Sequence, residues 1–270
     1  MTTCVRILSQ TKDVYICDAG TGIAPCGEDV AAEGEDVRTI HLFISHTHWD
    51  HIAGFMHFEP LWRDAYQIFV YSCHCDIRER IEYSLPFKHS AHTLNDVAAK
   101  LEFVRMDPGV SLELGGIRVT PMLQSHPAES FAFIFEKQGR KIIFSTDSDY
   151  TFTEALTPGS NAFSNADILT MDCQYTFSEF MQKSDWGHGN PFSCVDFAVR
   201  EKVRRLLLCH HDPAYGDDKV RELHHKAQRY LAHNYPASDL LIDYAQDNRS
   251  FLLEKSSSAI ASPARPMERG

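Results

Sequence analysis

The sequence predicts an α/β domain in which two β-sheets are covered on their outer faces by helices. The chain has 270 residues, 43% of them hydrophobic, which suffices for one large domain with a substantial core. Apolar runs bounded by turn residues recur along it, early in hairpins and later with helical patterns interleaved. Residues 1–254 are therefore assigned to a single domain, and residues 255–270, which are low in complexity, to a disordered tail.

The strands are predicted from apolar runs between turn residues. Runs at residues 5–8 and 14–17 flank Ser9–Lys12 and predict a first hairpin. Runs at residues 131–135 and 141–145 flank a turn that contains Gly139 and predict a second. Further strands are expected at residues 40–45, 66–71, 101–104, 117–120, 166–171 and 205–209.

Helices are predicted between these strands. Residues 76–83 and 92–99 are short candidates, and a third helix is expected at residues 193–203 with Ser193 as its N-cap. The clearest candidate covers residues 217–232, where apolar residues recur at helical spacing. Together with the strands, these helices predict two sheets with helices packed outside them.

The charge balance limits the partners of the protein. The chain has 26 Lys and Arg against 37 Asp and Glu, a net charge of -11. Because nucleic-acid binders usually present a basic face to phosphates, this balance argues against a large nucleic-acid substrate. No apolar run reaches the about 18 residues of a membrane span, and the N-terminus lacks the pattern of a signal peptide. We expect a cytoplasmic protein with no membrane partner.

Histidine is the feature of the composition that points to chemistry. The chain has 15 His, and its eight cysteines show no zinc-finger spacing. His46, His48, Asp50 and His51 follow an apolar strand closely. Residues two apart at a strand end point the same way, so His46 and His48 can share one metal. A turn at Trp49 would let Asp50 and His51 reach a second metal ion. The alternative is a histidine-rich loop that binds no metal. This ligand set suits Zn²⁺, Mn²⁺ or Fe²⁺.

The order His-x-His-x-Asp-His in residues 46–51 resembles the signature of the metallo-β-lactamase superfamily. The longer phrase at residues 45–55 is similar to the phosphodiesterase branch, which includes tRNase Z and small cyclic-phosphodiester hydrolases. The resemblance extends over about residues 4–230. It implies a four-layer αββα sandwich with two divalent metal ions at one edge of the sheets. Zn²⁺ is the expected metal, with Mn²⁺ and Fe²⁺ as alternatives.

The resemblance also implies the remaining metal ligands. By its position in the family's order of motifs, His126 is the third ligand of the first metal. Asp147 follows a buried strand and is implied as the carboxylate that bridges both metals, with Asp149 as a competitor. His210 is implied as the last ligand of the second metal. For His211, contact with substrate and simple packing are both open.

Two residues are implied for proton chemistry. In tRNase Z-like enzymes, a carboxylate and a histidine at the positions of Asp172 and His188 form a dyad beside the leaving group. A carboxylate that orients an imidazole suits it to proton transfer, although Gly187-His-Gly189 also fits a flexible loop. Asp50 is expected to orient the attacking water as well as to bind metal. The position of Asp18 lies close to the metal loop in members of the family, which implies that Asp18 supports the metal ligands without binding metal itself.

A further segment, residues 84–95, could overhang the site. Phe87 would then stack on a base, with His89 and His92 beside it. A packed connector explains the same residues.

The implied function is a dinuclear phosphodiesterase in which a metal-bound hydroxide attacks a small phosphodiester such as a cyclic nucleotide. The alternatives are hydrolysis of a lactone, thioester or β-lactam, and 3′-processing of tRNA. A non-enzymatic zinc-binding regulator is disfavoured, because such proteins typically lose ligands. For tRNA, the chain lacks an evident protruding arm between Asp147 and Asp172. Members of the superfamily are often dimers, so a homodimer is one expectation.

Overall fold

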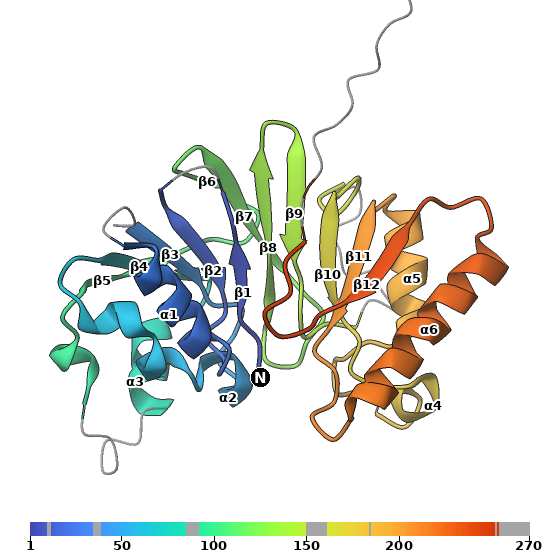
Figure 1. Cartoon of the computed structure of the whole chain (residues 1–270), viewed down its shortest axis with the longest axis horizontal. Coiled ribbons are helices and arrows are strands. Elements are labelled where there is room, and N and C mark those ends of the chain that lie inside the picture. The colour runs from blue at the N-terminus through green and yellow to red at the C-terminus, as the bar shows by residue number, and fades with distance from the viewer. Residues whose placement is uncertain are drawn as a thin grey trace, which may run out of the picture.

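Two β-sheets stand face to face in the molecule, and each carries helices on its outer side (Figure 1). The computed structural model describes residues 1–9, 12–34, 39–84, 92–149, 161–183, 185–251 and 253. Within this part of the chain the arrangement is the predicted four-layer αββα sandwich. The assignment of residues 1–254 to one domain stays a prediction, and the expected tail lies outside the described residues.

The first sheet has five strands in the order β1-β2-β3-β4-β5. The hairpin partners β1 and β2 are antiparallel, and β2 to β5 run parallel. All four residues of β2 are buried, as expected for a parallel strand that is covered on both faces. The strands are β1 (Val5–Ile7), β2 (Val14–Cys17), β3 (Thr39–Phe43), β4 (Gln67–Ser72) and β5 (Lys100–Arg105).

The second sheet has seven strands in the order β12-β11-β10-β9-β8-β7-β6. Strands β9 to β12 run parallel, whereas β6 to β9 form an antiparallel meander. The strands are β6 (Leu112–Leu114), β7 (Ile117–Leu123), β8 (Phe131–Lys137), β9 (Arg140–Phe144), β10 (Ile168–Asp172), β11 (Arg205–Cys209) and β12 (Leu241–Tyr244).

Helices cover the outer face of each sheet. On the first sheet, α1 and α3 contribute apolar residues to the outer core, and on the second, α5 and α6 do so. The α-helices are α1 (Ile23–Ala32), α2 (Trp49–Ile52), α3 (Ile77–Ser84), α4 (Phe177–Phe180), α5 (Pro191–Arg200) and α6 (Asp217–Asn234). Short 3-10 turns are η2 (Phe55–His57), η3 (Glu59–Trp62) and η4 (Leu94–Asp96).

The inner faces of the two sheets meet in a core rich in aromatic side chains. Phe43 of the first sheet packs against Phe133 of the second, with ring centroids 5.3 Å apart. Beside this core lies a buried polar residue of β3, His41. Its ring stacks on Tyr15, and its Nδ1 lies 3.0 Å from the hydroxyl of Tyr71. The inner core therefore joins the sheets and also encloses an ionisable group.

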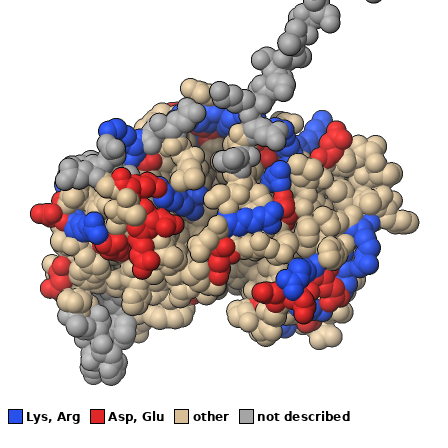
Figure 2. Space-filling model, viewed as in Figure 1, with Lys and Arg blue, Asp and Glu red and all other residues tan. Residues whose placement is uncertain are grey.

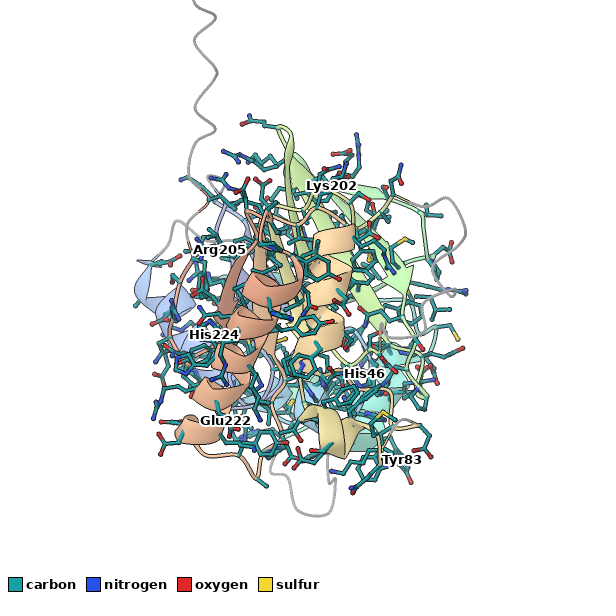
Figure 3. All side chains as sticks on the ribbon, turned by 90° about the vertical axis from the view of Figure 1, so that its right-hand side faces the viewer. His46, Tyr83, Lys202, Arg205, Glu222 and His224 are labelled. Carbon is teal, nitrogen blue, oxygen red and sulfur yellow. The ribbon has the colours of Figure 1, made fainter. Side chains whose placement is uncertain are left out.

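The strand directions bring the predicted site residues to one edge of the sandwich. His46, His126, Asp147 and His210 follow β3, β7, β9 and β11, and Asp172 ends β10. Loops that follow the carboxyl ends of parallel strands meet at one edge, where α/β proteins place their ligands. Figure 3 shows His46 in the lower half of the molecule and Lys202, which precedes β11, near the top.

Two helix predictions need correction. Residues 92–99 form no α-helix; a single 3-10 turn, Leu94–Asp96, follows the cap Thr93. The predicted helix at residues 193–203 begins at Pro191 and ends at Arg200, and its N-cap is Asn190. Ser193 is the third residue of this helix, and its hydroxyl completes the capping box with Asn190. Proline at the first helical position fits this start, because its missing N–H has no partner to lose.

Candidate metal centre

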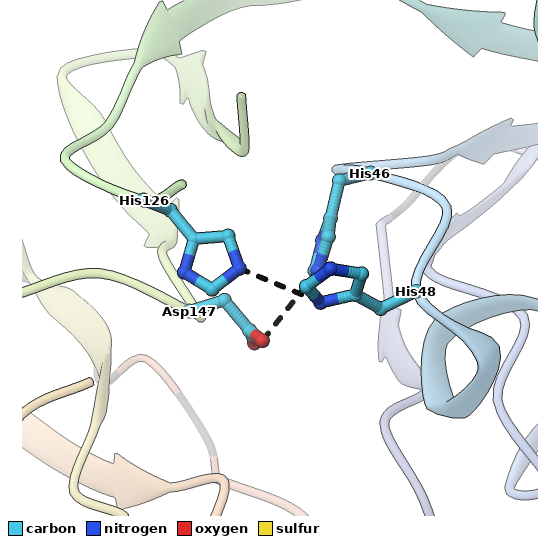
Figure 4. A group of neighbouring side chains, drawn as sticks. All are labelled: His46, His48, His126 and Asp147. Atoms are coloured by element: carbon cyan, nitrogen blue, oxygen red, sulfur yellow. Dashed lines mark hydrogen bonds and ion pairs between the residues drawn. The ribbon is translucent and has the colours of Figure 1, made fainter. Parts of the chain in front are cut away.

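The first group of candidate ligands contains His46, His48, His126 and Asp147 (Figure 4). One ligand atom from each lies within 4.8 Å of the others. His126 Nε2 lies 3.5 Å from His48 Nδ1, and His46 Nε2 lies 3.5 Å from Asp147 Oδ2. The four side chains come from three separate loops, and their nitrogen and oxygen atoms converge on one point.

The second group contains Asp50, His51 and His210. Asp50 Oδ2 lies 3.0 Å from His210 Nε2 and 3.4 Å from His51 Nε2. The helix α2 begins at Trp49, directly after His48, and contains Asp50 and His51. The side chains of residues 46–51 are thus divided between the two groups, in the way the predicted turn at Trp49 would divide them.

Asp147 lies between the two groups. Its Oδ2 faces His46, whereas its Oδ1 lies 3.1 Å from His51 Nε2 and 3.2 Å from His210 Nε2. Its backbone has a φ of 47°, in the left-handed region that a residue with a Cβ rarely adopts. This geometry is the one that a bridging carboxylate needs. The competitor Asp149 belongs to neither group among the described residues, and its N–H donates to the carbonyl of Ser125.

The hydrogen bonds of the imidazoles fit a metal. The Nδ1–H of His46 can donate to the Ser45 hydroxyl, 3.1 Å away, which leaves Nε2 with a lone pair. That Nε2 is buried and has no hydrogen-bond partner in the described structure. His51 Nε2 and His210 Nε2 also face each other at 3.3 Å. Because an orphaned buried nitrogen costs free energy, a cation bound between these atoms would satisfy them.

The electrostatics of the site also favour cations. Burial, together with the neighbouring His51, lowers the pKa of His46 to about 2, which keeps its lone pair available. Burial raises the pKa of Asp147, but His210 and His51 outweigh it and hold this pKa well below its usual range. Burial lowers the pKa of His210, yet Asp147, Asp50 and Asp172 raise it to about 9. The carboxylates that favour a proton on His210 also favour a metal ion beside it.

Asp18 connects the two ligand groups through hydrogen bonds. Its Oδ2 accepts from His51 Nδ1 at 2.7 Å and from the Ser45 hydroxyl at 2.9 Å, and its Oδ1 accepts from the Ser45 N–H. Through Ser45 it also reaches His46. Asp18 is fully buried and has a φ of 61°. It therefore fixes the tautomer of His51 directly and supports His46 through one hydroxyl. Ser45 was not singled out from the sequence, because its role depends on this contact.

Asp172 and His188 form a close pair beside both groups. Asp172 Oδ2 lies 2.7 Å from His188 Nδ1, and its Oδ1 accepts from the N–H of Gly189 and of Gln174. The ring of His188 stacks on that of His210 at 5.3 Å and lies 5.4 Å from that of His126. Because Nδ1 is engaged by the carboxylate, Nε2 is the atom left for a ligand.

A cavity of about 270 Å³ opens over these residues. Its lining includes Asp50, Asp147, His188 and His210 from the groups above. The other lining residues were not singled out from the sequence and are Gln174, Tyr175, Lys183, Trp186, Asp212 and Pro213. Lone aromatic and charged residues carry no periodic signal, so only the fold reveals that these residues face the site.

The remaining predicted candidates lie elsewhere. His211 belongs to neither ligand group; its Nδ1 donates to the carbonyl of Cys173, and β11 ends before it at Cys209. The Nε2 of His211 is buried and has no hydrogen-bond partner in the described structure, so packing and substrate contact both stay open for this residue. Phe87 and His89 lie outside the described residues, and His92 packs against the ring of Trp62, 5.0 Å away.

The chain belongs to the β-lactamase superfamily, since residues 15–211 match the family described as the β-lactamase superfamily domain. Ribonuclease Z of Treponema pallidum is 28% identical over 142 residues, which are 51% of this chain and 41% of that protein. The chain thus matches less than half the length of this curated relative.

Solved structures show the same fold. The metallo-β-lactamase fold protein YhfI from Bacillus subtilis aligns with a TM-score of 0.64 and 19% identity, covering 91% of this chain and 90% of that one. Yeast PDE1 aligns with a TM-score of 0.66 and 12% identity, covering 91% and 93%. The predicted metallo-β-lactamase sandwich is thereby confirmed. No helix among the described residues is long and apolar enough to cross a membrane.

Proposed function

We propose that the protein is a dinuclear metal-dependent phosphodiesterase that hydrolyses a small phosphodiester such as a cyclic nucleotide. The observation that carries this proposal is the 2.7 Å contact between Asp172 and His188 at the wall of the cavity. Metal ligands alone serve many hydrolases of this superfamily. The buried carboxylate of Asp172 orients the imidazole of His188 beside both ligand groups. A protonated imidazole can give its proton to a poor leaving group, such as an alkoxide on phosphorus.

The two ligand groups divide the metal-binding work. His46, His48 and His126 would hold one divalent ion, and Asp50, His51 and His210 the other, with Asp147 shared between them. Zn²⁺ is the proposed metal, and Mn²⁺ or Fe²⁺ suit the same donors. When bound, two such ions would lower the pKa of a nearby water and neutralise charge on the phosphoryl oxygens.

The residues of the chain then perform the remaining steps. Asp50, whose side chain is 40% exposed, accepts a hydrogen bond from the attacking water and orients it. The water loses one proton to bulk solvent, and its oxygen forms a bond to phosphorus while the bond between phosphorus and the leaving oxygen breaks. The imidazolium of His188, stabilised at Nδ1 by Asp172, gives the proton on Nε2 to that oxygen.

A second candidate is 3′-processing of tRNA, which the similarity to Ribonuclease Z favours. A ribonuclease also acts on phosphodiester bonds, so the similarity supports phosphorus chemistry for both candidates. Against a large RNA stands the net charge of -11. On the face shown in Figure 2, acidic and basic side chains are interspersed. The small substrate therefore remains our proposal. For a lactone, thioester or β-lactam, the described site offers no observation in favour.

The test combines metal analysis with a panel of substrates. We expect the purified protein to bind close to two metal ions and to hydrolyse bis(p-nitrophenyl) phosphate, with no turnover of a chromogenic cephalosporin. Cyclic 2′,3′- and 3′,5′-nucleotides and dinucleotides should be better substrates than precursor tRNA. Failure to bind metal, or turnover of the cephalosporin alone, would refute the proposal. A preference for precursor tRNA would establish the second candidate.

A further inference from the structure

The part of the cavity wall formed by Tyr175, Lys183 and Trp186 carries a positive charge. The ammonium nitrogen of Lys183 lies 4.1 Å from the ring centroid of Tyr175 and 5.1 Å from that of Trp186. Among the described residues that line the cavity, Lys183 is the one Lys or Arg. Two aromatic rings hold a flexible side chain in place while leaving its N–H groups able to donate. The carboxylate of Asp212 is 3.9 Å away, a loose pair at a partly exposed position.

An exposed aromatic face accompanies this charge. Trp186 is 55% exposed, although it lines the cavity and its indole meets the ring of Tyr175 at a centroid distance of 6.4 Å. An indole left open to solvent beside a lysine offers stacking and a phosphate contact at one place. Nucleotides carry both matching groups, a flat base and a phosphate.

The position of this wall identifies which half of the substrate it meets. The rings of His210, His188 and Tyr175 follow one another at centroid distances of 5.3 and 5.8 Å, and Lys183 lies over the last of them. His188 therefore stands between the metal ligands and the Lys183 wall. A group that leaves phosphorus towards His188 extends towards Lys183 and Trp186.

We propose that Lys183 and Trp186 form a leaving-group subsite for a nucleoside that carries a second phosphate. Within the proposed function, on which this inference rests, it narrows the substrate to linear phosphodiesters of the phosphorylated dinucleotide type. The base of the leaving nucleoside stacks on Trp186, and its additional phosphate accepts hydrogen bonds from Lys183. The cavity of about 270 Å³ suits one nucleotide half, near the lower end of small-molecule sites, with the other half outside it. A cyclic nucleotide has no second phosphate for Lys183.

The experiment compares three dinucleotides, ApA, pApA and ApAp, with the metal-loaded protein. Product analysis first shows whether the 3′-oxygen or the 5′-oxygen is released, which identifies the leaving nucleoside. The additional phosphate lies on the leaving nucleoside of pApA in the first case and of ApAp in the second. We expect KM to be about tenfold lower for that compound than for ApA, the size of a charge-assisted hydrogen bond. A phosphate on the other nucleoside serves as the internal control and should change KM little.

Two variants assign the preference to the subsite. Lys183→Met should abolish the tenfold preference, whereas Lys219→Met should retain it. Lys219 is a matched control, since its ammonium also lies over a tyrosine ring, that of Tyr215, but outside the cavity lining. Trp186→Ala should raise KM for all three dinucleotides about 5- to 100-fold, the range of base stacking on an aromatic side chain. Thermal unfolding of each variant checks that the fold is intact.

A binding measurement gives a readout independent of turnover. Fluorescence titration should show that Lys183→Met weakens the binding of AMP about tenfold relative to the wild type and leaves the binding of adenosine unchanged. Equal KM values for pApA and ApAp, or a preference that survives Lys183→Met, would overturn the subsite. Absence of turnover for every phosphodiester would instead overturn the proposed function.

Discussion

At the scale of single residues, the site depends on groups that touch no substrate. Each candidate histidine ligand needs one ring nitrogen free for metal. The hydrogen-bond partner of the other ring nitrogen decides which nitrogen stays free. Asp18 is hydrogen-bonded to the ring of His51 directly and to the ring of His46 through the hydroxyl of Ser45. Gly187 serves His126 through its carbonyl oxygen, 3.2 Å from Nδ1. The ligand types and their spacing were predictable from the sequence, whereas these partners depend on which loops the fold brings together.

We expect Asp18→Asn to lower the metal affinity of the protein about 10- to 100-fold. The amide has no negative charge to orient His51, and it can no longer accept every hydrogen bond that the carboxylate accepts. Competition with a chromophoric chelator measures the change. Asp149→Asn is the matched control, since Asp149 is a buried carboxylate that belongs to neither ligand group, and its affinity should equal that of the wild type. Equal affinity for Asp18→Asn would contradict the role of Asp18.

His188→Ala should reduce kcat by about 10²–10⁴ on a diester with an alkoxide leaving group, the usual contribution of a positioned general acid. The loss of kcat in this variant should be much smaller on bis(p-nitrophenyl) phosphate, because the leaving group of this compound needs little protonation. Metal content, measured by elemental analysis, should be unchanged, because the assigned ligands are all retained. His225→Ala on the exposed side of α6 is the control. A loss of bound metal in His188→Ala would make His188 a ligand instead.

At the scale of elements, strands were more predictable than helices. Every strand predicted from an apolar run is present, and strands buried on both faces, such as β2 and β10, leave a continuous apolar segment. The helix α1 was missed, since Pro25 and Gly27 within it argue against a helix by propensity. Packing requires one of these residues: a Cβ on Gly27 would lie 2.9 Å from the ring of Phe58. Tertiary contact therefore outweighs local preference in α1.

The start of α5 can be tested through its cap. Asn190→Ala should lower the free energy of unfolding by about 1–2 kcal/mol, because the buried side chain accepts from the N–H groups of Phe192 and Ser193. Urea denaturation measures the change. Thr93→Ala removes the cap of a three-residue turn and should cost less. If Ser193→Ala proves more destabilising than Asn190→Ala, the cap would lie at Ser193 after all.

At the scale of the whole molecule, the two sheets each contribute half of the candidate centre. Loops of the first sheet supply His46, His48, Asp50 and His51, and loops of the second supply His126, Asp147 and His210. The sequence predicted both sets and their association through the resemblance to a family. The cavity wall with Lys183 was not predictable, because no spacing relates it to the ligands.

Removal of metal should therefore loosen the contact between the sheets. We expect a chelator to lower the Tm, since metal that binds the folded state alone stabilises it by about 2.7 kcal/mol at a hundredfold excess over Kd. Calorimetry with and without added Zn²⁺ measures the shift. The shift should shrink in Asp147→Asn, which removes the shared carboxylate. An unchanged Tm in the wild type would show that the centre does not fasten the sheets.

The buried His41 predicts a dependence of stability on pH. Burial lowers the pKa of His41, and the partial opposing effect of Asp13 does not cancel it. Below the ordinary histidine pKa of about 6.5, the unfolded chain therefore takes up a proton that the folded protein resists, and stability falls as the pH falls. In His41→Gln this contribution should be absent. Urea denaturation at pH 7.5 and 5.5 should show a smaller loss of stability for the variant than for the wild type.

The contact between His51 and His210 joins residues 159 positions apart in the chain. Contacts of such long range are slow to form, because the entropy of closing the loop is lost before the contact stabilises anything. The candidate centre thus assembles only when the segments that contain His51 and His210 have met. Recovery of metal binding after dilution from denaturant should therefore report the meeting of these two segments.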